Sequence, residues 1–504
     1  MLKLIKFNNL KLLTMIKNKH LQLTLLTLII TTYSYAQNPP ALSAIKEADL
    51  KSDIYYLASD DMRGRRAGTI DELNAATWVA KRAADAGLKP AGDNGTYFQF
   101  FPLYRTTVAS NSEVKINGEN ARLWNDVYPV SPVETSVEGT PIWLNSLADT
   151  TSTIKNRIVA IKLLPPDKLP ADGMSLWVYR YALGAIRQQA NILKRQGVSA
   201  IILVADSTAN SKIGFFGHGF EEGQYELEES EWKNDKNDTP VFLVTPSFEE
   251  KLKEGNVTFK ANIRVNKFKY PSVNVVAKAE GKDPKLKEQY VLFSGHHDHD
   301  GVGKPVKGDS IWNGADDNAS VSVALLAIAR AWIKQPGKRS ALFVWHGAEE
   351  RGLMGSRYFV EHPTVKEENI VAILNGDMIG RNDPESAALL GSIAPHKNSS
   401  QLVEMAMNAN SELTKFMVDT SWDAEDHPEF WYYRSDHLPY AEVNIPAIFF
   451  TTLLHSDYHT PNDEADKIDI SKLAKMTEWM YATGWKVSET AQKPTLDLKS
   501  DVKD

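Results

Sequence analysis

Residues 289–299, QYVLFSGHHDH, join an apolar run to a cluster of three histidines and one aspartate. The apolar part, 289–294, predicts a β-strand, and His296 and Asp298 follow at its C-terminal end. Four similar runs come at 273–277, 340–345, 370–374 and 447–451, with helical segments between them. This alternation predicts an α/β fold around a central sheet.

Acidic residues and histidines mark the loops at the ends of these predicted strands. GADDN at 314–318 precedes an apolar helix at 319–332, and Glu349-Glu350 follow the run at 340–345. Asp377 closes the next run, and YHTP at 458–461 follows the last. Because strand C-termini gather at one edge of an open sheet, we expect these groups to meet. Together they suit two hard or borderline cations.

Each motif also has a purely structural interpretation. A lone His-x-Asp is common, and Asp-Asp-Asn before a helix is a good N-cap worth about 1 kcal/mol. A Glu-Glu pair is often a solvated loop. Five other histidines compete as ligands, His297, His299, His346, His437 and His455. Of these, His346 and His437 are more typical of supporting or structural positions. The conjunction of five such loops favours a metal site.

Composition narrows the chemistry further. The 504 residues carry a net charge of −7, which gives no electrostatic reason to expect a nucleic-acid partner. The absence of cysteine excludes disulfides, thiol catalysis and thiolate zinc sites. Any transition metal must therefore be held by His, Asp and Glu.

The N-terminal residues 1–36 predict a secretory signal peptide. No acidic residue precedes Glu47, five lysines lie before a short apolar stretch at 21–35, and Ser34 and Ala36 suit cleavage before Gln37. The alternative is an uncleaved anchor. Cleavage predicts a protein exported to the periplasm or the medium, without stable membrane insertion.

The rest of the chain shows three further parts. Residues 45–57 and 71–86 predict two helices, separated by RGRRAG at 63–68 and ended by Gly87. Between 110 and 268, short β-like runs at 158–163, 200–204 and 240–244 surround one helical segment at 182–195. Residues 206–238 are polar and glycine-rich, and predict a long loop. A helix at 469–487 precedes a charged tail at 491–504.

The motifs in this order resemble the co-catalytic zinc exopeptidases, which include aminopeptidase Y, aminopeptidase S and glutamate carboxypeptidase. The resemblance covers most of residues 45–487, including LASDDMRGR at 57–65, RSDH at 434–437 and IPA at 445–447. It implies a three-layer α/β/α zinc-exopeptidase (phosphorylase/hydrolase-like) domain with a mixed central sheet, formed by residues 37–110 and 269–490. Residues 111–268 resemble an inserted, mainly β protease-associated domain.

The resemblance also implies roles for individual residues. Two zinc ions would be bound, one by His296 and Asp377 and the other by Glu350 and His459, with Asp316 bridging both. Asp298 would orient His296, and Glu349 would act as the general base. Asp317 follows the predicted bridging residue, where the family has an unusual cis peptide bond. Other divalent metals, such as cobalt or manganese, suit the same ligands.

The implied activity is exopeptidase cleavage of peptides, with an aminopeptidase favoured because no arginine cluster surrounds the motifs. Arg381 and Arg434 are the cations available to a carboxypeptidase, and Tyr432, Tyr433 and Arg434 are candidate oxyanion donors. The segment 422–433, WDAEDHPEFWYY, forms either a substrate wall or a surface loop. Two further alternatives are a single-zinc acyltransferase resembling glutaminyl cyclases and a noncatalytic peptide-binding module.

Overall fold

The structure, a computed structural model, describes residues 39–149, 152–164, 175–228 and 239–497. The predicted signal peptide and residues 498–504 of the predicted tail lie outside these ranges. Within them, no helix is long and apolar enough to cross a membrane.

A ten-stranded mixed sheet organises the described chain, and all five strands predicted between 273 and 451 belong to it. Its order is β10-β2-β13-β17-β14-β18-β21-β19-β20, with β1 paired to β13. The central strands β17, β14, β18 and β21 are parallel, whereas β13 pairs antiparallel with both β2 and β17. The strands are β1 (Lys89–Pro90), β2 (Phe98–Val108), β10 (Gln224–Leu227), β13 (Val265–Ala279), β14 (Tyr290–His296), β17 (Ser340–His346), β18 (Ile370–Gly376), β19 (Ser386–Leu390), β20 (Met417–Asp419) and β21 (Ala447–Thr451).

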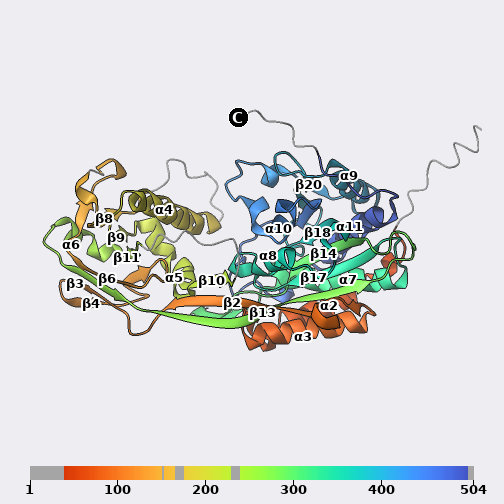
Figure 1. Cartoon of the computed structure of the whole chain (residues 1–504), viewed down its shortest axis with the longest axis horizontal. Coiled ribbons are helices and arrows are strands. Elements are labelled where there is room, and N and C mark those ends of the chain that lie inside the picture. Colours follow the sequence, from red (N-terminus) through yellow and green to blue (C-terminus); the bar gives the residue numbers. More distant parts are fainter. Residues whose placement is uncertain (1–38, 150–151, 165–174, 229–238, 498–504) are drawn as a thin grey trace, which may run out of the picture. The chain divides into compact units, whose positions relative to one another are not determined.

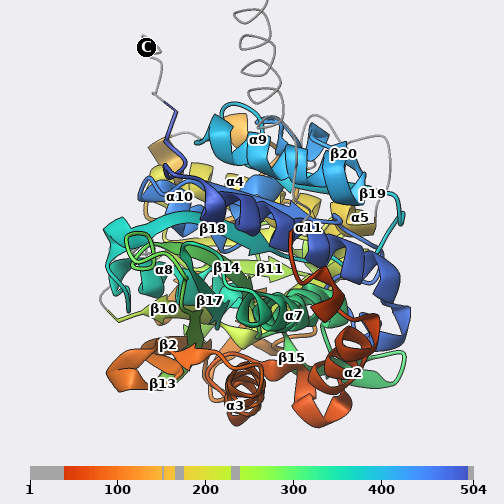
Figure 2. The same ribbon diagram turned by 90° about the vertical axis from the view of Figure 1, so that its right-hand side faces the viewer.

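Helices cover both faces of this sheet. Side chains alternate between the two faces along each central strand, and the apolar side chains on each face pack against helices. In β14, Val291 and Phe293 belong to one core, and Leu292 belongs to the other. The first core contains α2 (Glu47–Leu57), α3 (Ile70–Asp85), α7 (Ser320–Lys334), α9 (Ser400–Ala409) and α11 (Ile470–Glu489). The second contains α8 (Met354–Glu361) and α10 (His437–Glu442). Helices α7 and α11 lie side by side across the sheet (Figure 2). The predicted three-layer α/β/α arrangement is confirmed.

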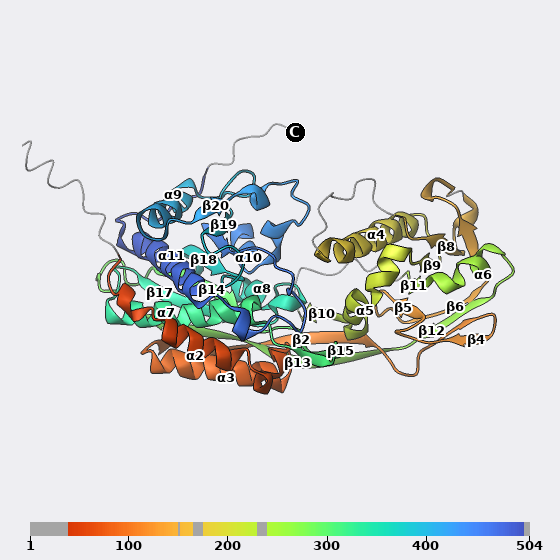
Figure 3. The same ribbon diagram turned by 180° about the vertical axis from the view of Figure 1, so that it is seen from behind.

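The two predicted N-terminal helices form and pack together (Figure 3). Thr69 caps α3 by accepting hydrogen bonds from the amides of Asp71 and Glu72. Buried Asp53 of α2 lies 2.6 Å from the guanidinium of Arg82 on α3. Gly87 follows α3 with a φ of 92°, a conformation that favours glycine and ends the helix.

Most of residues 111–268 form two smaller sheets. In the sequence β2 comes before this segment and β13 begins at its end, and in space these two strands pair side by side (Figure 1). One sheet contains β5 (Val127–Pro129), β7 (Ile142–Leu144), β8 (Ile158–Lys162), β9 (Ala200–Val204) and β11 (Val241–Val244). The other contains β3 (Glu113–Ile116), β4 (Glu119–Ala121), β6 (Thr135–Gly139) and β12 (Phe259–Ile263). Helix α4 (Ser175–Arg195) contains the helical segment predicted at 182–195, and α5 (Ser207–Glu222) and α6 (Glu249–Lys253) are additional helices. The division into an inserted protease-associated domain stays a prediction.

The predicted loop at 206–238 is wrong for its first part. Residues 207–222 form α5, and residues 224–227 form β10, which pairs with β2 of the main sheet. The Asp206 side chain caps the helix by accepting a hydrogen bond from the amide of Ala209. Glycine lowers helix propensity here, but burial of Ile213 and other apolar side chains against their core overrides it. Residues 229–238 lie outside the described ranges.

A substitution in α11 tests the packing of the central layer. A Cβ on Gly484 would lie inside contact distance of the Phe293 ring and 3.1 Å from Leu374 Cδ1. We expect Gly484→Ala to lower the free energy of unfolding by about 1–3 kcal/mol despite the better helix propensity of alanine. Gly184→Ala in α4, where no atom lies within 4 Å, is the control and should be neutral or stabilising. Thermal unfolding followed by circular dichroism measures both; a stabilised Gly484→Ala would contradict the tight packing.

Candidate metal centre

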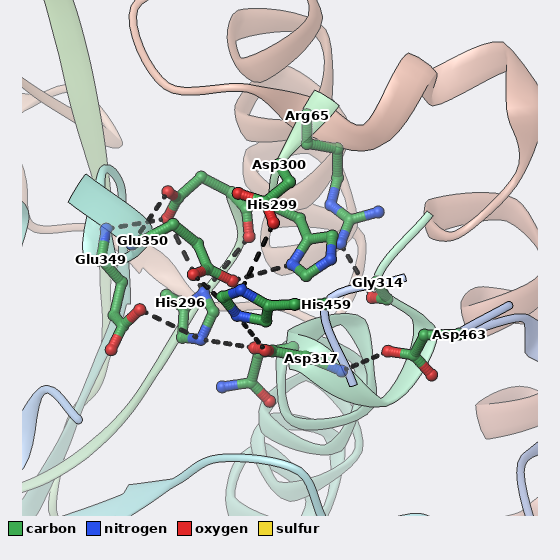
Figure 4. A network of polar contacts seen from close by, with 12 residues as sticks. Arg65, His296, His299, Asp300, Gly314, Asp317, Glu349, Glu350, His459 and Asp463 are labelled. Carbon is green, nitrogen blue, oxygen red and sulfur yellow. Dashed lines mark hydrogen bonds and ion pairs between the residues drawn. The ribbon is translucent and has the colours of Figure 1, made fainter. Parts of the chain in front are cut away.

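Loops at the C-terminal edge of the parallel strands bring histidines and carboxylates together (Figure 4). His296 ends β14, and Glu349 and Glu350 lie in a turn just after β17. The remaining members of the predicted site follow β18, β21 and β16 (Asp309–Trp312): Asp377, His459 and the acidic pair Asp316-Asp317.

The side chain at the middle of this cluster is Asp317. Its Oδ1 lies 3.2 Å from Nε2 of His296, and its Oδ2 lies 3.2 Å from Nε2 of His459. His296 Nε2 also lies 3.5 Å from Asp377 Oδ1, and His459 Nε2 lies 3.1 Å from Glu350 Oε2. One carboxylate therefore has an oxygen facing each of the two His–carboxylate pairs.

Asp316, the residue predicted to bridge two ions, does not occupy this central position, which Asp317 takes instead. Asp316 Oδ1 accepts a hydrogen bond from the amide of Gly380, and Oδ2 faces His455 at 3.4 Å. Asp316 belongs to none of the candidate metal groups found among the described residues, whereas Asp317 does. The two side chains point in different directions because they are consecutive in the turn before α7. The cis peptide bond lies between Asp317 and Asn318, also one residue later than expected.

The donor atoms of the cluster fit a divalent metal. Within the described ranges, His296 Nε2, His459 Nε2 and Asp377 Oδ1 are buried and make no hydrogen bond. Three groups of donors converge with all atoms within 4.8 Å: His296, Glu349 and Asp377; His296, Asp317 and Glu350; and Asp300, Glu350 and His459. Buried nitrogen and oxygen donors without partners are costly alone, and a bound cation would satisfy them. Imidazole and carboxylate donors are what zinc accepts in the absence of cysteine.

Charges in the cluster shift the pKa values of its members strongly. Burial raises the pKa of the Glu349 carboxyl well above its usual range, as do the nearby carboxylates Glu350 and Asp377, although His296 opposes them. Burial alone would lower the pKa of His296, but the carboxylates of Glu349 and Asp377 outweigh it and raise that pKa. Such strongly perturbed groups in one buried cluster indicate a functional site.

Asp298 lies beside His296, the residue that it is predicted to orient, and it also holds the turn that follows β17. The main-chain oxygen of Asp298 lies 3.2 Å from His296 Nδ1, and its carboxylate lies 3.7 Å from the same atom. The carboxylate accepts hydrogen bonds from the amides of Glu349 at 3.0 Å and Glu350 at 3.4 Å. One side chain therefore fixes the positions of two predicted site residues as well as facing a third.

Two more residues of the HHDHD stretch lie beside the site: His299, which competed as a ligand, and Asp300, which was not predicted. His299 Nδ1 lies 2.8 Å from Glu350 Oε1. Asp300 Oδ2 lies 3.4 Å from His459 Nδ1. Both residues follow directly after the predicted His296-x-Asp298 motif. This adjacency in the sequence was the signal that could have placed Asp300 near the site.

Arg65 and Asp463, also missed, hold the turn that carries Asp317. The fully buried guanidinium of Arg65 donates to the carbonyls of Asn313 at 2.6 Å and Gly314 at 2.9 Å. Burial lowers its pKa to about 10, although Asp298 and other nearby carboxylates favour the charged form. The Asp463 carboxylate accepts from the amide of Asp317 at 3.0 Å. These contacts join residues far apart in the sequence, so no local sequence pattern could predict them.

The predicted substrate-binding residues lie in different surroundings. Arg434 donates to the Tyr458 hydroxyl at 2.7 Å, beside His459, whereas Arg381 is paired with Asp457 at 2.8 Å. Tyr432 is buried and stacks on His396 with ring centroids 4.1 Å apart. Tyr433 is 46% exposed, and its hydroxyl lies 3.1 Å from His396 Nε2.

The competing histidines lie outside the three candidate groups. His346 Nε2 lies 3.2 Å from the Tyr440 hydroxyl, and His437 packs against Phe449 with ring centroids 4.9 Å apart. His455 faces Asp316.

Curated relatives of the chain include proteins named as aminopeptidases and a leupeptin-inactivating enzyme. A probable leucine aminopeptidase of Trichophyton verrucosum (strain HKI 0517) is 28% identical over 200 residues, 38% of this chain and 52% of that protein. Aminopeptidase YwaD of Bacillus subtilis (strain 168) is 26% identical over 188 residues, 36% and 39% of the two chains. Leupeptin-inactivating enzyme 1 of Streptomyces exfoliatus is 39% identical over 182 residues, 34% of each chain. The matches span about half or less of the length of these relatives.

Solved structures resemble the chain over most of its length. An aminopeptidase from Aneurinibacillus sp. strain AM-1 has a TM-score of 0.59 at 18% identity, covering 90% of this chain and 96% of its own. BSAP, a zinc aminopeptidase from Bacillus subtilis, has a TM-score of 0.57 at 18% identity, covering 88% and 96%. At this identity the likeness shows a shared fold. The model described as Peptidase family M28 matches residues 274–484, which hold His296, Asp317, Glu349, Glu350, Asp377 and His459. The family match is confined to this part of the chain, which is similar to peptidase family M28.

Proposed function

We propose that the protein is a zinc-dependent aminopeptidase that removes residues from the free amino end of peptides. The observation that carries the proposal is the position of Asp317, which presents one carboxylate oxygen to each of His296 and His459. A carboxylate between two His–carboxylate pairs is the arrangement that two metal ions about 3.5–4 Å apart require.

Each zinc ion would have its own pair of ligands as well as the shared aspartate. His296 and Asp377 would hold one ion, Glu350 and His459 the other, and Asp317 both. Bound zinc would polarise the scissile carbonyl and lower the pKa of a water molecule. The Ser435 hydroxyl donates to Asp377 Oδ2 at 2.8 Å and so keeps the other oxygen of Asp377, Oδ1, turned towards His296.

Glu349 is the proposed general base. Its Oε2 lies 3.8 Å from His296 Nε2, at the edge of the cluster, and its pKa is raised mainly by burial. A carboxylate with a raised pKa at this place accepts the proton of the attacking water and then delivers it to the leaving amine. The hydrogen bond from the Glu349 amide to the Asp298 carboxylate holds the main chain at this residue and so helps to direct its side chain at the reacting centre.

An aminopeptidase fits the charges around the cluster better than a carboxypeptidase does. The free ammonium of a substrate needs carboxylates, and two of the five carboxylates in the candidate groups, Glu349 and Asp300, are not assigned as zinc ligands. Arg381, offered for a terminal carboxylate, is already paired with Asp457. The aminopeptidase names of several relatives support the same choice. The predicted signal peptide supports action outside the cytoplasm.

Matched dipeptides test which chain end the enzyme needs. We expect the zinc-loaded protein to hydrolyse unblocked and C-amidated dipeptides, and to leave N-acetylated ones intact. Cleavage of the acetylated form that is lost on C-amidation would identify a carboxypeptidase instead. No cleavage with zinc bound would favour the acyltransferase or peptide-binding alternatives.

A further inference from the structure

A buried cluster of ion pairs links helix α5 to the loop that follows β14. Glu222, the last residue of α5, lies 2.9 Å from the guanidinium of Arg351 and is also paired with Arg66. Glu222 is 5% exposed, so both pairs are largely removed from water. The two arginines come from separate parts of the chain, one before α3 and one directly after Glu350.

Both arginines hold Asp300. Arg66 donates to the main-chain carbonyl of Asp300 through Nε at 3.0 Å and Nη2 at 2.9 Å. Arg351 Nη2 donates to Asp300 Oδ1 at 3.0 Å. The backbone and the side chain of one aspartate are therefore fixed by two guanidinium groups, and a single carboxylate, Glu222, fixes both of these groups.

The free oxygen of Asp300 faces the candidate metal centre. Its Oδ2 lies 3.4 Å from Nδ1 of His459, while Nε2 of that ring faces Glu350 and Asp317 (Figure 4). A carboxylate on the outer nitrogen of a metal-binding histidine fixes the ring orientation and raises its basicity. The two carboxylate oxygens of Asp300 therefore have different partners: Oδ1 accepts a hydrogen bond from Arg351, and Oδ2 faces His459.

We propose that Glu222 is a positioning residue for the metal centre, acting through Arg66, Arg351 and Asp300 on the ring of His459. The inference rests on the proposed function, because it assigns His459 as a metal ligand. It gives residues 111–268, where Glu222 lies, a direct part in shaping the site. Two carboxylates and two guanidinium groups balance the charge of the cluster, which a buried network needs.

The protonation of Glu222 agrees with this role. Burial alone would raise the pKa of its carboxyl, but Arg351, His218 and Arg66 together lower that pKa to about 2. Glu222 therefore carries its charge at neutral pH. Glu222→Gln removes the charge while keeping the size of the side chain.

Zinc titration of the metal-free full-length protein, in competition with a chromophoric chelator, measures the effect on each ion separately. We expect Glu222→Gln to weaken one of the two affinities by about tenfold, the lower end of the range for outer-shell partners, and to leave the other within about twofold. His459→Ala should abolish the same affinity. Glu254→Gln, an exposed carboxylate of the same region, is the control and should change neither.

A double variant separates positioning from general stability. Asp300→Asn should weaken the same affinity as Glu222→Gln. If Glu222 acts through Asp300, the double variant should lose no more affinity than Asp300→Asn alone. Additive losses, equal weakening of both ions, or unchanged affinities in Glu222→Gln would each overturn the proposal. If Glu222→Gln does not fold, Glu222→Asp, which keeps the charge but is too short to reach both arginines, replaces it and is judged by the same outcomes.

A metal-free crystal structure of the Glu222 variant distinguishes this proposal from the ligand assignment. We expect Asp300 Oδ2 to move away from His459 Nδ1 while the main sheet is unchanged. An unmoved Asp300 would overturn the positioning role even if zinc binds as proposed. Full zinc binding by His459→Ala would instead refute the ligand assignment of the proposed function.

Discussion

Replacing Glu349 with glutamine should abolish most peptide hydrolysis and leave both zinc ions bound. Glutamine has the same shape, and the main-chain hydrogen bond from residue 349 to Asp298 is retained. The amide cannot accept a proton from the attacking water, and general bases contribute about 100-fold to 10,000-fold to the rate. We therefore expect kcat to fall by at least about 100-fold with little change in KM.

Two measurements make this prediction specific to the base. Zinc content by elemental analysis should equal that of the unsubstituted protein, which separates loss of chemistry from loss of metal. Glu368→Gln, an exposed carboxylate in the turn after α8, is the matched control and should keep full activity. A kcat near normal in Glu349→Gln would remove this residue as the base.

Replacing Asp317 with asparagine should prevent stable binding of both zinc ions. The carboxylate faces His296 and His459 with its two oxygens, so the substitution weakens both sites together. Loss of an outer-shell partner alone costs about 10–100-fold in affinity, and we expect loss of this shared ligand to exceed 100-fold for each ion. Zinc titration in competition with a chelator measures both affinities, and activity should fall with metal content.

Asp316→Asn is the matched neighbour. Asparagine at position 316 keeps a carbonyl oxygen that can accept the hydrogen bond from the Gly380 amide, so we expect both zinc ions to remain bound. Loss of zinc from Asp316→Asn with retention in Asp317→Asn would restore Asp316 as the bridging residue and refute the assignment made from the structure.

Much of the architecture could be predicted because its signals are local. Apolar runs such as 340–345 and 370–374 identify buried strands, and Gly87 marks the end of a helix. The loops that follow these strands then point to one edge of the sheet, so His296, Glu349, Glu350 and His459 could be expected to meet. Residues 206–228 show the limit of local signals, because burial of apolar side chains turns a glycine-rich segment into α5 and pairing with β2 makes β10.

The choice between Asp316 and Asp317 shows the same limit at the site. Both have the same chemistry and adjacent places in one motif. The α/β fold, and the presence of an aspartate of this turn in the cluster, could therefore be predicted from residue order alone. Tertiary structure decided which aspartate it is, because Arg65 and Asp463 hold the turn from positions far away in the chain. It also decided that Arg351 reaches Asp300 and that Glu222 reaches Arg351. Side-chain direction and ion pairing depend on where distant segments are packed, and residue order alone does not contain that information.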